Sequence, residues 1–417
     1  MSLLKSRVAF ACILSVAITG SLFASETSFA AAKAKPTTKT PAVTYKNLTS
    51  ADFNTSFSAM KALKPLAAKG TGSVAAILPD TVSSTRWTEF DAPYLAKAMA
   101  AAGLSSSQII VQNAQGSDST FITDAQSDIT AGAKVLLITP VDSATGDQVE
   151  KLANAAGVKV IDYDRLTLGG ATTDKYYVSF NNVKVGALEG QGLVDCVKQW
   201  KVKSPQVIVN HGAATDNNAT QFAQGYFSVL NPYFNGKGWT DVEGANGYLA
   251  GTWDPPTAET QFQQAFTAHP TANATLTAND ATAAAIITYL QQQGVKPYTF
   301  PTTGQDASLP GLQNIISGYQ CGTVYKPVFL EAQAATALAM YLRAGVTPPK
   351  SLINGSTQDT VANVAIPSVL ETPQWVTAAT IEKTVVKDQF VPASQICAGA
   401  PPTGPSYAAD CTKYKIH

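Results

Sequence analysis

The sequence predicts an α/β fold built as two lobes, each with a parallel sheet flanked by helices. Short apolar runs alternate with helical patterns along most of the chain, which is typical of βαβ units. The alternation covers about eleven predicted strands, more than one ordinary sheet holds. Hydrophobic residues make up 45% and charged residues 14% of the 417 residues, a composition that supports a sizeable core. These observations indicate two similar α/β units joined end to end.

The N-terminus is expected to carry an export signal. Basic residues precede an apolar run at 8–22, and small residues around 30–34 suit an A-x-A type cleavage site. The run is short for a membrane anchor and contains polar residues. We therefore predict a signal peptide at 1–32. Residues 33–70 are predicted to form a polar tether followed by an amphipathic helix at 49–68.

The first lobe is predicted to hold five strands. Continuous apolar runs predict the strands, and apolar residues at three- and four-residue steps predict the helices between them. The best-marked strand ends in Asp164 and Arg165. The predicted strands are 74–79, 108–112, 134–139, 158–163 and 176–180, and the helices are 87–102, 121–131 and 143–156. This order predicts a parallel sheet with right-handed crossovers.

The second lobe repeats the pattern. Its Gly-rich stretch at 186–192 lies inside a helical pattern, which favours close helix packing over a phosphate-binding turn. The predicted strands are 206–210, 241–244, 274–278, 298–302 and 322–325, with helices at 183–200, 214–230, 255–268, 281–293 and 309–316. A helix at 329–344 and a strand at 361–369 follow, and the remaining tail is too short for a third lobe.

Four cysteines lie beyond the predicted signal, and export permits disulfides. Cys397 and Cys411 flank a loop rich in Pro and Gly and are the pair that the spacing favours. Cys196 and Cys321 would then pair by elimination, or remain as two buried thiols.

Several functional classes are excluded by the residues present. Lys and Arg together number 29, as do Asp and Glu, so no basic excess exists for nucleic acid. The three histidines are not at metal-ligand spacing, and no cysteine pair has zinc spacing. The chain has neither a G-x-S-x-G nucleophile motif nor a P-loop. We therefore predict no catalytic residues, no metal and no cofactor.

Polar and aromatic residues gather at the ends of the predicted strands. Because ligands of open α/β sheets bind at the carboxyl ends of the strands, these clusters are expected to meet at one site. Carboxylate, amide and guanidinium groups bond hydroxyls in pairs, and flat Trp rings cover apolar C–H faces. This chemistry suits a sugar. A glycosidase would need two isolated acids flanking one bond, whereas here the acids stand beside amides and arginines.

Taken in order, the clusters resemble the periplasmic sugar-binding proteins of ABC transporters, and specifically the xylose-binding branch of the ribose/galactose-binding, or type I, fold. They run in the same order over nearly the whole exported chain. The clusters are Arg86-Trp87, Tyr163-Asp164-Arg165, Phe180-Asn181-Asn182, Asp216-Asn217-Asn218, Asn279-Asp280-Ala281-Thr282, Gly304-Gln305-Asp306-Ala307 and Val324-Tyr325-Lys326-Pro327. The chain departs from the family at Pro79-Asp80-Thr81, at His211-Gly212-Ala213-Ala214, and in the tail after Val391. The first two differences line or border the expected cleft.

The resemblance implies two Rossmann-like lobes joined by three hinge strands, with the sugar in the cleft between them. The implied ligand-binding residues are Arg86, Trp87, Asp164, Arg165, Asp216, Asn218, Trp253, Asn279, Asp306 and Lys326. The implied crossings lie near 180–182, 325–327 and 367–373. The N-terminal lobe would then comprise 71–181 with 328–368, and the C-terminal lobe 182–327 with 369–392, followed by a disulfide-bonded tail at 393–417.

The function implied is capture of a monosaccharide, with a xylose-like aldose as the first choice, and its delivery to an ABC permease in the membrane. The protein would act as an exported monomer, in the periplasm or at the outer face of the cytoplasmic membrane. The main alternative is a sensor that presents its closed form to a chemoreceptor or kinase. A secreted glycosidase is a further alternative.

Overall fold

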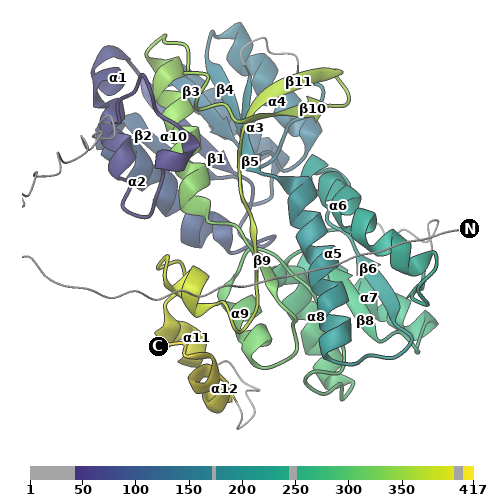
Figure 1. The fold of residues 1–417 in the computed structure, drawn as a ribbon. Helices are drawn as coiled ribbons and strands as arrows, with labels where there is room; N and C mark the ends of the chain where they lie inside the picture. The colour runs from purple at the N-terminus through teal and green to yellow at the C-terminus, as the bar shows by residue number, and fades with distance from the viewer. Residues whose placement is uncertain (1–42, 171–174, 244–250, 399–406) are drawn as a thin grey trace, which may run out of the picture. The chain divides into compact units, whose positions relative to one another are not determined.

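A seven-stranded sheet forms the centre of the first lobe. The computed structural model describes residues 43–170, 175–243, 251–398 and 407–417, so the predicted signal peptide and most of the tether lie outside the described residues. Only the β10–β11 pair is antiparallel among the strands described in this sheet. The strand order is β10(Gly355–Asp359)-β11(Val364–Glu371)-β5(Tyr176–Phe180)-β4(Lys159–Tyr163)-β3(Ala133–Ile138)-β1(Ser73–Leu78)-β2(Ile109–Asn113) (Figure 1).

Successive residues of a strand point to opposite faces of the sheet, and both faces of this sheet carry apolar residues. Helices cover both faces. Val74 and Ala76 share a core with α2 (Ala92–Ala102) and α10 (Val328–Arg343). Ala75 and Ile77 pack instead with residues of α3 (Asp118–Thr130) and α4 (Ser143–Ala155). The continuous apolar strands of the sequence are therefore strands buried on both faces.

The second lobe is built on a three-stranded parallel sheet in the order β7-β6-β8. One face packs on α5 and α6, and the other packs on α7 and α8. Gly186 and Gly190 of α5 lie against the backbone of α6, which confirms the prediction of close helix packing there. The elements are α5 (Asn182–Gln199), β6 (Gln206–Asn210), α6 (Asn217–Phe234), β7 (Thr240–Asp241), α7 (Pro255–Ala268), β8 (Ala274–Thr277), α8 (Asp280–Gln292) and α9 (Leu309–Ile316).

The chain passes between the two sheets at three places. The first is the step from β5, which ends at Phe180, into α5. The second follows β9 (Thr323–Tyr325) and leads into α10. The third separates β11 from β12 (Gln374–Val376), which pairs antiparallel with β9. These are the three regions where the family resemblance implied hinge strands.

The N-terminal segment differs from the helix predicted at 49–68. It forms 3-10 turns at Ser50–Asp52 and Ser58–Leu63 and a short helix, α1 (Lys64–Lys69). Phe57 has a φ of 56°, and this left-handed backbone interrupts a continuous helix. The apolar residues that gave the periodic pattern are nevertheless buried in the first lobe: Phe53, Phe57, Met60, Leu63 and Leu66.

The strand predictions also need correction at five places. The predicted strand at 298–302 is an irregular segment with a single bridge from Thr302 to Thr275, since Tyr298 is left-handed and Pro301 has no N–H. β7 (Thr240–Asp241) is shorter than the strand predicted at 241–244, and β11 begins later than the strand predicted at 361–369. Strands β10 and β12 were not predicted.

The C-terminal segment packs on the second lobe. It contains a π-helical turn at Glu382–Val386 (η5) and the helices α11 (Ala393–Ala398) and α12 (Tyr407–Tyr414), which contact α9. A disulfide joins Cys397 to Cys411, the pair favoured by spacing. A second disulfide joins Cys196 of α5 to Cys321. The alternative of two buried thiols at those positions was therefore wrong.

No helix in the described part of the chain is long and apolar enough to cross a membrane.

Candidate ligand-binding site

All ten residues proposed from the sequence line one cavity between the two lobes. The space within it is about 300 Å³, including its opening to solvent. The residues come from loops that follow the carboxyl ends of strands in both lobes, as expected for an open α/β sheet. Lining residues are Ser83, Ser84, Arg86, Trp87, Asp164, Arg165, Asp216, Asn218, Phe222, Trp253, Asn279, Gln305, Asp306 and Lys326.

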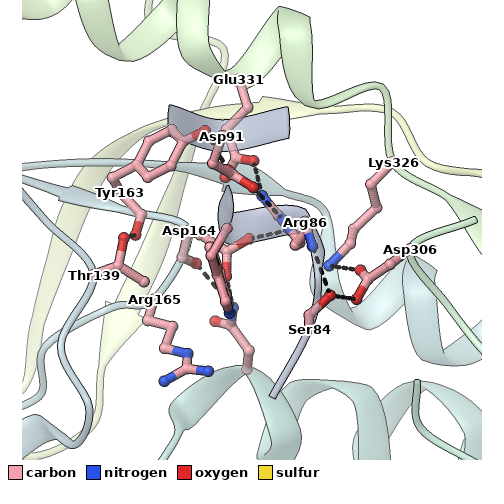
Figure 2. A network of polar contacts seen from close by, with 12 residues as sticks. Ser84, Arg86, Asp91, Thr139, Tyr163, Asp164, Arg165, Asp306, Lys326 and Glu331 are labelled. Atoms are coloured by element: carbon pink, nitrogen blue, oxygen red, sulfur yellow. Dashed lines mark hydrogen bonds and ion pairs between the residues drawn. The ribbon is translucent and has the colours of Figure 1, made fainter. Parts of the chain in front are cut away.

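Arg86 is the buried cation around which one wall of the cavity is arranged (Figure 2). Its guanidinium donates to both carboxylate oxygens of Asp91 at 2.8 Å. It also donates at 2.7 Å to Asp164 and at 2.7 Å to Glu331 on α10. Burial and the neighbouring Asp164 raise the pKa of Glu331 well above its usual range. One guanidinium therefore holds three carboxyl groups in place, and the raised pKa of Glu331 limits the excess of negative charge.

Trp87 lies in the same short π-helix as Asp91, η3 (Trp87–Asp91), which begins directly after Arg86. The centre of its ring lies 4.6 Å from the guanidinium carbon of Arg86 and 5.4 Å from that of Arg165. Its indole N–H donates to the hydroxyl of Ser83 at 2.9 Å. The ring is thus held by two cations and a hydrogen bond, with only 3% of its surface exposed.

The end of β4 supplies Asp164 and Arg165. Asp164 has a φ of 62°, a left-handed conformation that Asp tolerates better than most residues. This conformation lets its side chain reach Arg86 while its carbonyl oxygen accepts from Asn218 at 2.8 Å and from Tyr177 at 2.7 Å. The resulting turn fixes the Asp-Arg pair of the sequence at the cavity.

Asp216 connects three groups of the cavity wall. Its Oδ1 accepts from the backbone N–H of Asn218 and caps α6. Its Oδ2 lies 3.2 Å from Nε of Arg165 and accepts from the indole N–H of Trp253 at 3.0 Å. Burial raises the pKa of Asp216, although Arg165 opposes this rise. The Trp253 ring lies directly on Gly212, where a Cβ atom would come within 2.2 Å of it.

Asp306 and Lys326 form an ion pair of 2.9 Å at the far wall. Burial alone would raise the pKa of Asp306, but Lys326 and Arg86, with a hydrogen bond from Ser84, hold it below its usual range. Asp306 is therefore an ionised acceptor in a site almost closed to water, where charge-assisted hydrogen bonds to hydroxyls are strong.

Direct bonds cross the cavity between the lobes. The hydroxyl of Ser84 donates to Asp306 at 2.7 Å, and the amide of Asn279 donates to the carbonyl oxygen of Ser83 at 2.8 Å. The Arg165–Asp216 pair and the bond from Asn218 to the Asp164 carbonyl also join segments of different lobes. The two lobes are therefore closed on each other in this structure.

An acidic residue that follows a strand could also cap the helix after it, and this applies to one of the three acidic residues concerned. Asp216 caps α6 and lines the cavity as well. Asn279 rather than Asp280 caps α8, and Ser308 rather than Asp306 caps α9. Asp280 is not among the lining residues, and burial raises its pKa to about 7.

Four lining residues were not proposed from the sequence: Ser83, Ser84, Phe222 and Gln305. Phe222 lies four positions after Asn218 in α6, a spacing that places both on one helix face and could have signalled it. Gln305 lay inside one of the sequence clusters. The two serines had no local signal, because their role depends on partners in the other lobe.

The cavity offers paired donors and acceptors on several sides and the flat rings of two tryptophans, an arrangement suited to a small ligand rich in hydroxyl groups. Across the described residues, no group of three or more His, Cys, Asp or Glu is placed to hold a metal ion. Fold and site together define a two-lobed binding protein.

The chain belongs to the family of the periplasmic binding protein domain, whose model matches residues 75–346. It is similar to the D-xylose-binding periplasmic protein of Escherichia coli (strain K12), with 35% identity over 69% of this chain and 83% of that protein. It is also similar to the multiple sugar-binding periplasmic receptor ChvE of Rhizobium radiobacter, with 31% identity over 80% of this chain and 94% of that protein.

Among solved structures, the chain resembles a carbohydrate transporter solute binding protein from Chloroflexus aurantiacus in complex with D-glucose. The TM-score is 0.68 and the sequence identity 28%, over 78% of this chain and 98% of that one. These relatives are binding proteins, and this chain is likewise a binding protein rather than an enzyme.

Proposed function

We propose that this protein captures a monosaccharide, with a xylose-like aldose as the first choice, and delivers it to an ABC importer. The observation that carries the proposal is the single cavity into which ten residues from distant clusters converge. The relatives named for D-xylose, for multiple sugars and for D-glucose support the same ligand class. The ten residues are proposed as the sugar contacts.

Capture would work by closure of the two lobes about the three connecting segments. We propose that the lobe boundaries lie near residues 181 and 327 and in the connection after β11. Each of these three connections would act as a hinge. Closure hides the ligand from water, and the closed surface would be recognised by the membrane permease. We further propose that the protein is exported and acts as a monomer, as its predicted signal peptide and periplasmic relatives suggest.

Titration calorimetry of the purified protein with pentoses, hexoses and disaccharides tests the ligand class. We expect a monosaccharide, D-xylose first, to bind with the highest affinity. Failure of every sugar in the panel to bind would overturn the proposal.

Asp306→Asn tests the site itself. The substitution removes the charge that pairs with buried Lys326 and that accepts from Ser84. Sugar affinity should fall by about 10- to 100-fold, corresponding to roughly 1–3 kcal/mol for a charged hydrogen-bonding partner. Asp118→Asn is the matched control, because Asp118 is exposed on α3 and does not line the cavity. Equal sugar affinities in the two variants would show that Asp306 does not contribute to sugar binding and has only a structural role.

A further inference from the structure

An aromatic stack outside the cavity joins the C-terminal segment to the first lobe. The rings of Phe90 and Phe390 lie with centroids 3.8 Å apart and planes inclined by 19°. Phe90 belongs to η3, whereas Phe390 follows η5, three hundred residues later in the chain. Phe90 is 7% and Phe390 4% exposed, so each ring buries the other.

Phe390 is held on the side of the second lobe. Its ring meets the ring of Tyr325 at 5.1 Å and 65°, and the Tyr325 hydroxyl donates to Asp388 at 3.1 Å. It shares a core with residues of α9, of β12 and of the tail up to the disulfide-bonded Cys411. Apart from Phe90 and Val328, the buried residues of this core lie outside the first lobe, so Phe390 is held mainly by the second lobe and the tail.

Phe90, by contrast, lies in η3 of the first lobe, which contains the cavity residue Trp87 and directly follows Arg86. It is three residues after Trp87 and directly precedes Asp91, whose carboxylate accepts two bonds from Arg86. A side chain that presses on Phe90 therefore acts on the turn that fixes both Arg86 and Trp87 at the ligand cavity.

We propose that Phe390 is a positioning residue for sugar binding, acting through Phe90 to stabilise the closed arrangement of the lobes. This inference rests on the proposed function. A contact made only when the lobes are closed adds its free energy to that of the bound state, so its loss weakens binding without touching the ligand. The contact does not take part in the first encounter of sugar and protein. Its loss should therefore raise the dissociation rate rather than lower the association rate.

The test uses Phe390→Leu and Phe90→Leu, with the sugar that binds most tightly to the full protein. Stopped-flow tryptophan fluorescence gives the association and dissociation rates. Each variant should release sugar about five- to tenfold faster, the range expected for loss of a buried aromatic pair, while the association rate changes less than about twofold. The double variant should release sugar no faster than the more affected single variant, because both substitutions remove one contact.

Phe266→Leu is the matched control. Phe266 stacks on Phe262 in the core shared with α7 and α8, away from the cavity. It should lower thermal stability without changing the dissociation rate.

The inference would be overturned by single variants that keep the wild-type dissociation rate, by additive effects in the double variant, or by an equal change in the control. If one single variant fails to fold, the other still decides the question. If the unmodified protein binds no sugar, the proposed function fails as well, which distinguishes that outcome from failure of this inference alone.

Discussion

Replacing Arg86 by Met should destabilise the protein in a way that depends on pH. The substitution leaves Asp91, Asp164 and Glu331 without their shared cation in a buried site. Breaking a buried ion pair from one side costs about 3–5 kcal/mol, because uncompensated charge stays behind in a medium of low polarity. We expect a loss of this size in the free energy of unfolding at pH 8.

The loss should shrink as the pH falls. Burial already raises the pKa of Asp91 and of Glu331, and removal of the Arg86 cation raises both further. A carboxyl group whose pKa is higher in the folded protein stabilises it below the unfolded pKa, and that stability is lost as the pH rises through the folded pKa. Protonation of such a group removes its uncompensated charge, so the loss relative to the wild type should be smaller at pH 5.5 than at pH 8.

Urea denaturation followed by tryptophan fluorescence at the two pH values measures both quantities. Lys151→Met is the control, because Lys151 forms an exposed ion pair with Asp147 and its side chain is 70% exposed. That pair should contribute little at either pH. A loss below about 1 kcal/mol for Arg86→Met, or a loss of equal size at both pH values, would refute a central role for Arg86 in neutralising the three carboxyl groups.

Two further predictions concern the second lobe. Gly212→Ala should displace the Trp253 ring, since a Cβ atom there would lie 2.2 Å from it, and lower sugar affinity tenfold or more by calorimetry. Gly236→Ala, where no atom lies within 4 Å, should change nothing, and an unchanged affinity in both variants would remove Trp253 from the site. Burial lowers the pKa of His211 to about 4 from a usual 6.5. The contribution of neutral His211 to the free energy of unfolding is therefore present above pH 6.5 and is lost as the pH falls through 4. The wild type should lose about 3 kcal/mol more than His211→Gln between pH 7 and pH 3.5, and parallel losses in urea denaturation would contradict this.

The alternating pattern of the sequence predicted most of the strands and helices because each depends on residues near in the chain. It failed where the backbone turns locally, as at Phe57 and Tyr298, since a left-handed residue leaves no mark on hydrophobic periodicity. It also missed β12, whose three residues become a strand only by pairing with β9.

The sequence by itself determined that polar clusters stand at strand ends, and parallel strands bring their carboxyl ends to one edge. That physical rule is sufficient to place Asp164, Arg165 and Asn279 near a shared site. Only the tertiary structure decided that Ser84 bonds Asp306, that Glu331 joins Arg86, and that Phe390 stacks on Phe90. Each of these contacts joins segments more than two hundred residues apart, so its formation depends on the tertiary arrangement of the chain and not on local pattern.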